Sequence, residues 1–88
     1  MIVVYSKPGC VYCVKAKDWL SSHGFEYVEA DITKNPEDYN FIVDAGHKTL
    51  PQIYARDGYG ALRLLVAGGF NGLESLTPAE LQEKLETP

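Results

Sequence analysis

The 88-residue sequence contains only two cysteines, no long hydrophobic segment and no excess of positive charge. Two cysteines are too few for the disulfide framework of a small secreted domain, which usually needs about four to eight. The longest uncharged apolar run spans residues 64–70, far below the roughly 20 residues of a membrane-spanning helix. Twelve acidic residues against eight basic ones give a net charge of −4. This balance argues against nucleic-acid binding, because phosphate recognition requires a positive face.

The rest of the composition is that of a folded protein, with 45% hydrophobic and 23% charged residues. The apolar fraction is too high for a disordered tail, and a chain of this length does not build two separate cores. We therefore expect one domain over residues 1–88. Residues 1–5 lack the basic region and the hydrophobic length of a signal peptide. We also expect a cytoplasmic monomer with no membrane or nucleic-acid partner.

The apolar pattern alternates between segments typical of strands and segments typical of helices. Strands are predicted over residues 2–5, 25–32, 52–55 and 62–67, and the turn residues 57–60 join the last two into a hairpin. Helices are predicted after Cys10, after Asn35 and after Thr77. The resulting order, β-α-β-α-β-β-α, predicts an α/β fold in which a four-stranded mixed sheet has helices on both faces.

The predicted helices have clear starts and apolar faces. Asn35 and Thr77 are capping residues, and each is followed by a proline at the first helical position. The predicted buried stripes are Cys13, Ala16, Trp19 and Leu20; Tyr39, Ile42 and Val43; and Leu81 and Leu85. His23 and His47, near the ends of the first two helices, are interpreted as surface residues.

Cys10-Val11-Tyr12-Cys13 is the motif that carries chemistry. It follows a predicted strand and a Pro-Gly turn and opens a helix, which places Cys10 at or near the N-cap. Free N–H groups and the helix dipole favour an anion there, so they lower the pKa of the Cys10 thiol and favour the attacking thiolate. Cys13 lies nearly one turn further on, at the head of the apolar stripe, within reach of Cys10. We predict that Cys10 attacks a substrate disulfide and that Cys13 resolves the mixed disulfide.

Two other interpretations of the cysteine pair fit the sequence less well. A structural zinc site needs two further ligands, and the spacing of His23 and His47 matches no common zinc motif. Two inert core cysteines are disfavoured because Cys10 lies in a Pro-Gly turn rather than on a packing face. No metal site is therefore predicted, and the redox interpretation is favoured.

With the cysteine pair in place, nearly the whole chain resembles the glutaredoxins, small oxidoreductases of the thioredoxin fold. Residues 3–13 resemble the family's first strand and its Cys-Pro-Tyr-Cys site. Residues 49–54, Thr-Leu-Pro-Gln-Ile-Tyr, resemble its Thr-Val-Pro-Gln-Ile-Phe segment, and residues 68–71 resemble its Gly-Gly turn. Leu73 and Leu76 match the helix that follows this turn. The resemblance implies a dithiol glutaredoxin, an enzyme that reduces protein disulfides and glutathione mixed disulfides.

The resemblance also implies a glutathione site. Pro51 is cis in this family, Leu50 presents its backbone to the cysteinyl part of glutathione, and the N–H groups of Phe70 and Asn71 hold the γ-glutamyl carboxylate. The full set of implied binding residues is Lys7, Tyr12, Thr49, Leu50, Pro51, Gly69, Phe70 and Asn71. Glutathione is then the reducing co-substrate. The implied partners are disulfide-containing or glutathionylated proteins, with ribonucleotide reductase as one such protein substrate.

The sequence departs from the family pattern at two places in this site. Val11 replaces the usual proline, as in some phage members, and Asn71-Gly72 stand where an acid would pair with the glutathione ammonium. These departures leave two alternatives open. One is a glutaredoxin-like electron donor that is reduced by thioredoxin reductase. The other is a dimeric iron–sulfur cluster carrier with Cys10 and glutathione as ligands. The predicted hairpin over residues 55–67 is also longer than is usual in the family.

Overall fold

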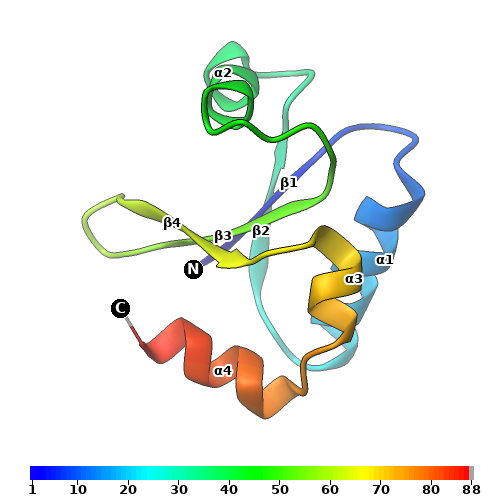
Figure 1. Ribbon diagram of the computed structural model, residues 1–88, viewed down its shortest axis with the longest axis vertical. Coiled ribbons are helices and arrows are strands. Elements are labelled where there is room, and N and C mark those ends of the chain that lie inside the picture. The colour runs from blue at the N-terminus through cyan, green and yellow to red at the C-terminus, as the bar shows by residue number, and fades with distance from the viewer. Residues whose placement is uncertain (88) are drawn as a thin grey trace.

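Four short strands form a mixed sheet in the order β2-β1-β3-β4 (Figure 1). They are β1 (Ile2–Ser6), β2 (Tyr27–Asp31), β3 (Gln52–Arg56) and β4 (Leu62–Val66), in a computed structural model that describes residues 1–87. Strand β2 runs parallel to β1, whereas β3 is antiparallel to both β1 and β4. The four-stranded mixed sheet predicted from the sequence is confirmed.

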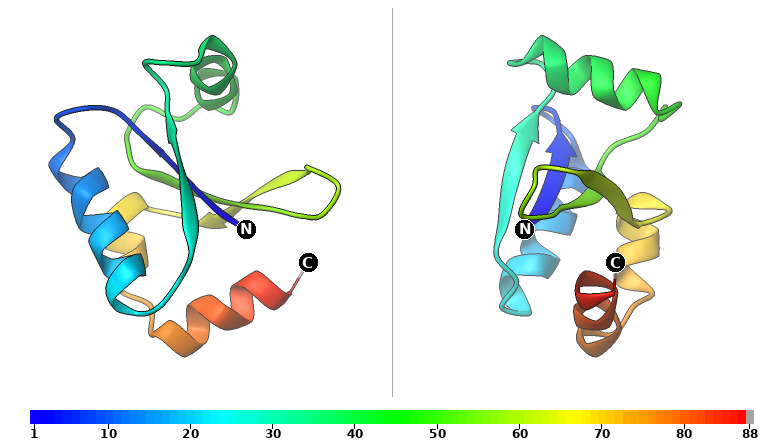
Figure 2. Two further views of the ribbon diagram at one scale, coloured as in Figure 1. Left: turned by 180° about the vertical axis from the view of Figure 1, so that it is seen from behind. Right: turned by 90° about the vertical axis from the view of Figure 1, so that its left-hand side faces the viewer.

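Four helices flank this sheet: α1 (Val11–Ser22), α2 (Pro36–Asp44), α3 (Gly69–Glu74) and α4 (Pro78–Glu86). Figure 2 shows α2 on one side of the strands and the other three helices on the opposite side. The predicted order has one helix fewer, because the six residues of α3 are too few to display a helical period of their own. The resemblance alone implies a helix after the Gly-Gly turn; α3 contains Leu73 of this predicted helix and ends before Leu76. No helix within residues 1–87 has the length and apolar character needed to cross a membrane.

The alternation of side chains along β1 divides the core into two layers. Val4 points to the side of α1 and α4, where it belongs to one cluster with Leu20 and Leu81. Tyr5 points to the other side and packs in a second cluster with Ile42 of α2. Both sides of the sheet are therefore covered, and the carboxyl end of β1 leads directly into the segment that carries Cys10.

The buried face of α2 differs from the predicted one. Ile42 is 4% exposed, but Tyr39 and Val43, predicted to share its stripe, are 51% and 50% exposed. Phe41 takes their place in the core, where its ring stacks on that of Tyr5 with 5.4 Å between the centroids. Of the nine residues of α2, this adjacent pair belongs to the core cluster on that side of the sheet. Two apolar side chains of α2 are thereby left at the surface.

His47 is also placed differently from the prediction. The chain after α2 returns over β3, and His47 Nε2 lies 2.6 Å from the hydroxyl oxygen of the buried Tyr54. His47 is thus a half-buried residue with a tertiary partner. His23 ends α1 as its C-cap and packs beside Trp19, with 4.3 Å between the ring centroids.

The predicted helix starts are confirmed. The side chain of Asn35 accepts the Glu37 N–H at 2.9 Å at the start of α2. Thr77 and Glu80 form a reciprocal capping box at the start of α4, with bonds of 3.0 and 3.2 Å.

The loop between β3 and β4 is a tight hairpin that projects from the sheet on the side away from α1 (Figure 1). Its Asp57 carboxylate accepts the N–H groups of Tyr59 and Ala61 at 2.8 and 3.0 Å, which orders the turn. The Tyr59 side chain at the tip is 99% exposed. The tip therefore contributes nothing to the core.

Candidate active site

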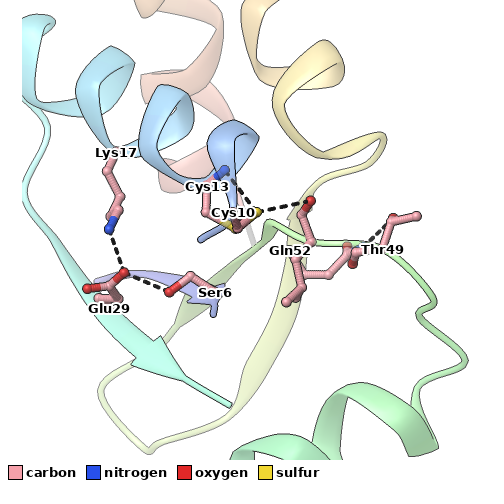
Figure 3. Close-up of a disulfide and its surroundings, with 8 residues drawn as sticks. Ser6, Cys10, Cys13, Lys17, Glu29, Thr49 and Gln52 are labelled. Carbon is pink, nitrogen blue, oxygen red and sulfur yellow. Dashed lines mark hydrogen bonds and ion pairs between the residues drawn. A yellow bond between two sulfur atoms is a disulfide. The ribbon is translucent and has the colours of Figure 1, made fainter. Parts of the chain in front are cut away.

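Cys10 is the N-cap residue of α1, as the sequence predicts. The chain leaves β1 at Ser6 and turns at Gly9, whose φ of +76° favours glycine. Cys10 Sγ then accepts the backbone N–H of Cys13 at 3.2 Å (Figure 3). The first turn of α1 therefore directs at this sulfur an N–H that has no partner within the helix, together with the positive end of the helix dipole. Both stabilise a thiolate relative to a thiol.

Cys10 and Cys13 form a disulfide, with their Cα atoms 5.2 Å apart. Cys13 is 1% exposed and packs in the core, whereas Cys10 is only half-buried. Cys10 is thus the sulfur that an external disulfide can reach, and Cys13 is accessible chiefly to Cys10. Within residues 1–87, no three His, Cys, Asp or Glu side chains converge as metal ligands would.

The segment 49–51, which leads into β3, faces the disulfide. The Leu50–Pro51 peptide bond is cis, as the family resemblance implies. The Leu50 carbonyl oxygen lies 3.9 Å from Cys10 Sγ, and the Gln52 side-chain amide holds the turn by donating to the Thr49 carbonyl at 2.8 Å. An incoming sulfur at Cys10 would therefore lie next to the Leu50 backbone.

A groove of about 260 Å³ opens between this segment, α1 and α3, and we call it the Gly-Gly groove. It is lined by Tyr12, Thr49, Leu50, Pro51, Gly68, Gly69, Phe70 and Asn71. Every binding residue implied by the resemblance lines it except Lys7. The structure thus brings these residues together beside the cysteine pair.

Glycine is required at the floor of the Gly-Gly groove. Gly69 has a φ of +60°, and a Cβ built there would lie 3.2 Å from the Pro51 carbonyl oxygen. Gly68, with a φ of +88°, is the N-cap of α3. A side chain at either position would strain the backbone, so the groove depends on the close approach of α3 to the cis-proline segment.

Lys7 lines a second hollow on the opposite side of Leu50. This hollow of about 430 Å³ is named here the α2 cleft. It is lined by Lys7, Cys10, Ile32, Tyr39, Ile42, Val43, His47, Lys48, Thr49 and Leu50. Sequence reasoning missed it, because its lining comes from three separated segments that share no motif. The available signal is the apolar residues of α2, Tyr39 and Val43, which the helical pattern predicts in the core.

Exposed apolar side chains also lie on the first turn of α1. Val11, Tyr12 and Val14 are each more than half exposed. Lys15 Nζ lies 5.3 Å from the centroid of the Tyr12 ring and 6.0 Å from that of Phe70. These cation–π contacts hold one positive charge at the rim of the Gly-Gly groove.

A polar cluster ties α1 to β1 and β2 near the disulfide (Figure 3). Glu29 Oε2 accepts the hydroxyl of the buried Ser6 at 2.7 Å and pairs with Lys17 Nζ at 2.6 Å. The hydrogen bond from Lys17, followed by that from Ser6, lowers the pKa of the Glu29 carboxyl, and the same ion pair raises the pKa of Lys17. No sequence motif indicates this cluster, because its members come from three elements.

Comparison with known proteins agrees with this geometry. The family model described as glutaredoxin matches residues 2–59. The glutaredoxin-like protein NrdH of Lactococcus lactis subsp. cremoris is 35% identical over 57 residues, which are 65% of this chain and 79% of that protein. Glutaredoxin 1 of Rickettsia conorii is 38% identical over 56 residues, which are 60% of this chain and 55% of that protein.

Solved structures confirm the fold class. The glutaredoxin from Brucella melitensis superposes with a TM-score of 0.65 at 25% identity, over 99% of this chain and 91% of that chain. The NrdH-redoxin from Escherichia coli, described as glutaredoxin-like with a thioredoxin-like activity profile, gives 0.66 at 22% identity, over 99% and 97% of the two chains. The sheet and the helices around it therefore follow a thioredoxin-like architecture.

Proposed function

This chain belongs to the glutaredoxin family of thiol–disulfide oxidoreductases, and we propose that it reduces protein disulfides and glutathione mixed disulfides through Cys10, with glutathione as its reductant. The observation that carries the proposal is the position of Cys10. Cys10 is half-buried at the N-cap of α1, where its sulfur accepts a helix N–H, while its partner Cys13 is buried. One sulfur is thus prepared for attack and the other for resolution.

The proposed reaction is a pair of thiol–disulfide exchanges. The Cys10 thiolate attacks one sulfur of the substrate disulfide, and the other sulfur leaves as a thiolate. The Cys13 thiolate then attacks Cys10, which releases the second substrate sulfur and leaves the Cys10–Cys13 disulfide. Two electrons pass to the substrate, whose thiolates take up two protons. The N-terminus of α1 stabilises the Cys10 thiolate whenever it attacks or leaves.

Glutathione would return the disulfide to the dithiol in two further exchanges. One glutathione thiolate attacks Cys10 and frees Cys13, and a second attacks the glutathione sulfur and leaves as glutathione disulfide. The Gly-Gly groove supports this step. It lies beside the Leu50 backbone, with which the cysteinyl part of a peptide can pair as an added strand.

A thioredoxin reductase is a second candidate reductant, and one feature of α3 favours it. Asn71 is uncharged, and a Cβ on Gly72 would overlap the Ala67 carbonyl oxygen, so position 72 holds no acid in this backbone. The ammonium of glutathione therefore lacks a carboxylate from either residue. The similarity to the Lactococcus NrdH and the thioredoxin-like activity profile of the Escherichia coli NrdH-redoxin point in the same direction.

The test is NADPH oxidation with either glutathione plus glutathione reductase or a thioredoxin reductase as the electron source. The substrates are a glutathionylated peptide and the oxidised form of ribonucleotide reductase, the protein substrate included in this proposal. Turnover with glutathione is expected in the wild type and should fall at least about a thousandfold in Cys10→Ser, because a serine hydroxyl does not form the mixed disulfide. Serine is a good N-cap, so this variant should keep its fold.

Cys13→Ser is the matched control. It should still reduce the glutathionylated peptide, since free glutathione can resolve the intermediate, and should lose the reduction of a protein disulfide by thioredoxin reductase. If Cys10→Ser retains activity, Cys10 is not the nucleophile. Turnover with thioredoxin reductase and none with glutathione would establish the second candidate.

A further inference from the structure

We propose that the polar cluster on α1, β1 and β2 positions the resolving cysteine for its attack. The cluster consists of Ser6, Lys17 and Glu29 and is called here the Glu29 cluster (Figure 3). By fixing α1, it keeps Cys13 within reach of a mixed disulfide on Cys10. This inference rests on the proposed function, since it requires that Cys13 resolves such an intermediate.

Ser6 is a polar residue at a place where packing alone would favour an apolar one. It ends β1, whose preceding residues are Ile-Val-Val-Tyr, and it is only 1% exposed. Since Val4 points to the side of α1, Ser6 points there as well, two residues further along the strand. A buried hydroxyl costs free energy unless it is hydrogen-bonded. Ser6 meets this requirement by donating to Glu29 Oε2 at 2.7 Å, so the hydroxyl serves a specific contact beneath α1.

The Glu29 cluster joins the two ends of the segment that carries both cysteines. Ser6 lies four residues before Cys10, and Lys17 lies four residues after Cys13. Both Ser6 and Lys17 donate to the same oxygen, Glu29 Oε2. Glu29 is itself held to β1 by the parallel pairing of β2. The redox segment is therefore closed on itself by hydrogen bonds as well as by the chain.

Apolar side chains provide the packing between α1 and the sheet, where Ala16 and Leu20 share a core cluster with Val4. Such packing is not directional, whereas a charge-assisted hydrogen bond has a preferred length and angle. The contact between Lys17 and Glu29 therefore determines where α1 lies along the strands. The position of Cys13, one helical turn before Lys17, follows from it.

The position of Cys13 governs the second exchange of the proposed reaction. The Cys13 thiolate forms a bond with the Cys10 sulfur, and the substrate sulfur leaves as a thiolate, which completes the transfer of two electrons to the substrate. Intramolecular attack depends steeply on alignment, and a displacement of about 1 Å can slow it about a hundredfold. Loosening α1 should therefore weaken closure of the Cys10–Cys13 disulfide and leave the first attack by Cys10 unchanged.

The experiment measures the equilibrium between the dithiol and disulfide forms in buffers of 2-mercaptoethanol and 2-hydroxyethyl disulfide. These small neutral probes require neither glutathione nor a reductase. Acid quenching, alkylation and mass spectrometry give the fraction of each form, and hence the equilibrium constant for disulfide closure. A substitution that destabilises both forms equally leaves this constant unchanged, so it separates positioning of Cys13 from general support of the fold.

Lys17→Met should lower the closure constant about tenfold, which makes the reduction potential about 30 mV less negative. Ser6→Ala removes the hydroxyl without changing any charge and should lower the constant about threefold. Lys17→Arg keeps both the charge and a donor and should remain within about twofold of the wild type. Lys84→Met is the matched control, because it removes the same charge from an exposed position on α4, and it should also remain within about twofold.

The first attack is followed separately, as the rate at which each pre-reduced variant reacts with 2-hydroxyethyl disulfide. This rate should change less than about twofold, because Cys10 keeps its place at the N-cap of α1. Thermal melts of the dithiol and disulfide forms establish that the compared variants are folded.

Equal closure constants for Lys17→Met and Lys84→Met would overturn the inference. A wild-type constant in Ser6→Ala beside a tenfold loss in Lys17→Met would overturn it too, because the charge of Lys17 would then act without the cluster. In both cases the proposed function stands as long as the wild type reacts with 2-hydroxyethyl disulfide. If the pre-reduced wild type does not react with it, the proposed function fails together with the inference.

Discussion

The two hollows beside Leu50 differ in the groups that line them. The Gly-Gly groove is shaped largely by backbone, with two glycines and a cis-proline segment on its floor and no charged residue in its lining. The α2 cleft is lined by side chains, among them two lysines and the apolar wall of α2. Backbone groups recognise what all peptides share, whereas side chains distinguish one peptide from another. The shape of the first hollow therefore depends on the backbone, and that of the second depends on its side chains.

This difference also predicts how each hollow responds to mutation. A side chain at Gly68, Gly69 or Gly72 forces the backbone to move, because these glycines bring α3 against its neighbours. A substitution of Lys7, Tyr39, Val43 or Lys48 in the α2 cleft replaces an exposed side chain and should leave the fold unchanged. Changes in the groove should therefore affect stability, and changes in the cleft should affect specificity.

The largest effect is expected for Gly72→Ala, which breaks the groove. The added methyl group would overlap the Ala67 carbonyl oxygen, so α3 must shift away from the end of β4. We expect a loss of about 3 kcal/mol in the free energy of unfolding and a fall of more than about 10 °C in Tm. Denaturant titration and calorimetry measure both quantities.

Gly58→Ala in the hairpin is the matched control for Gly72→Ala. A Cβ at Gly58 meets no atom within 4 Å, so its stability should change by less than about 0.5 kcal/mol. Similar stability of the two alanine variants would show that α3 accommodates a side chain at position 72. The groove would then be adjustable in the same way as the cleft.

A smaller effect is expected for Asn71→Asp, which gives the groove the charge that it lacks. If the ammonium of glutathione lies beside α3, the new carboxylate should lower the KM for glutathione about fivefold through a charged hydrogen bond. Asn40→Asp, at an exposed position on α2, adds the same charge away from the groove and should leave the KM unchanged. A KM that is the same in both variants would place the ammonium elsewhere and strengthen the case for a thioredoxin reductase.

The smallest effect is expected for Glu29→Gln, because Glu29 and Lys17 line neither hollow. The folded-state pKa of Glu29 lies below its ordinary value of 4.5, so its contribution is present above that pH and disappears as the pH falls through the lower folded value. Both side chains are partly exposed, which limits the loss in Glu29→Gln to less than about 1 kcal/mol at pH 7. The stabilities of the variant and the wild type should converge at low pH, and a constant difference down to pH 2 would exclude the ion pair as the cause.

Local chemistry was sufficient to predict much of the fold and the centre of the site. Capping residues fixed the starts of α2 and α4, and the Pro-Gly turn before Cys10 predicted the N-cap that the structure contains. The cis bond at Pro51 was implied only by the family resemblance, because residue type alone favours a trans bond.

The sequence predictions are wrong where contacts between residues far apart in the sequence determine which side chains are buried. Tyr39 and Val43 fit a helical period with Ile42, but the core is reached by Phe41, through an aromatic contact with Tyr5 that no local pattern shows. The sequence predicts His47 at the surface, because its partner Tyr54 belongs to another element and no local pattern shows the contact. Tyr39 and Val43, which the sequence predicts in the core, instead form an exposed wall of the α2 cleft.

The hairpin between β3 and β4 is a suitable site for attaching the protein to a solid support. Its tip, with the Tyr59 side chain in solvent, points away from α1 and the reactive sulfur (Figure 1). A linker grafted there would anchor the chain to a resin with Cys10 facing outward. Coupled in this way, Cys13→Ser becomes a bait that retains its clients covalently until a reducing agent elutes them for mass spectrometry.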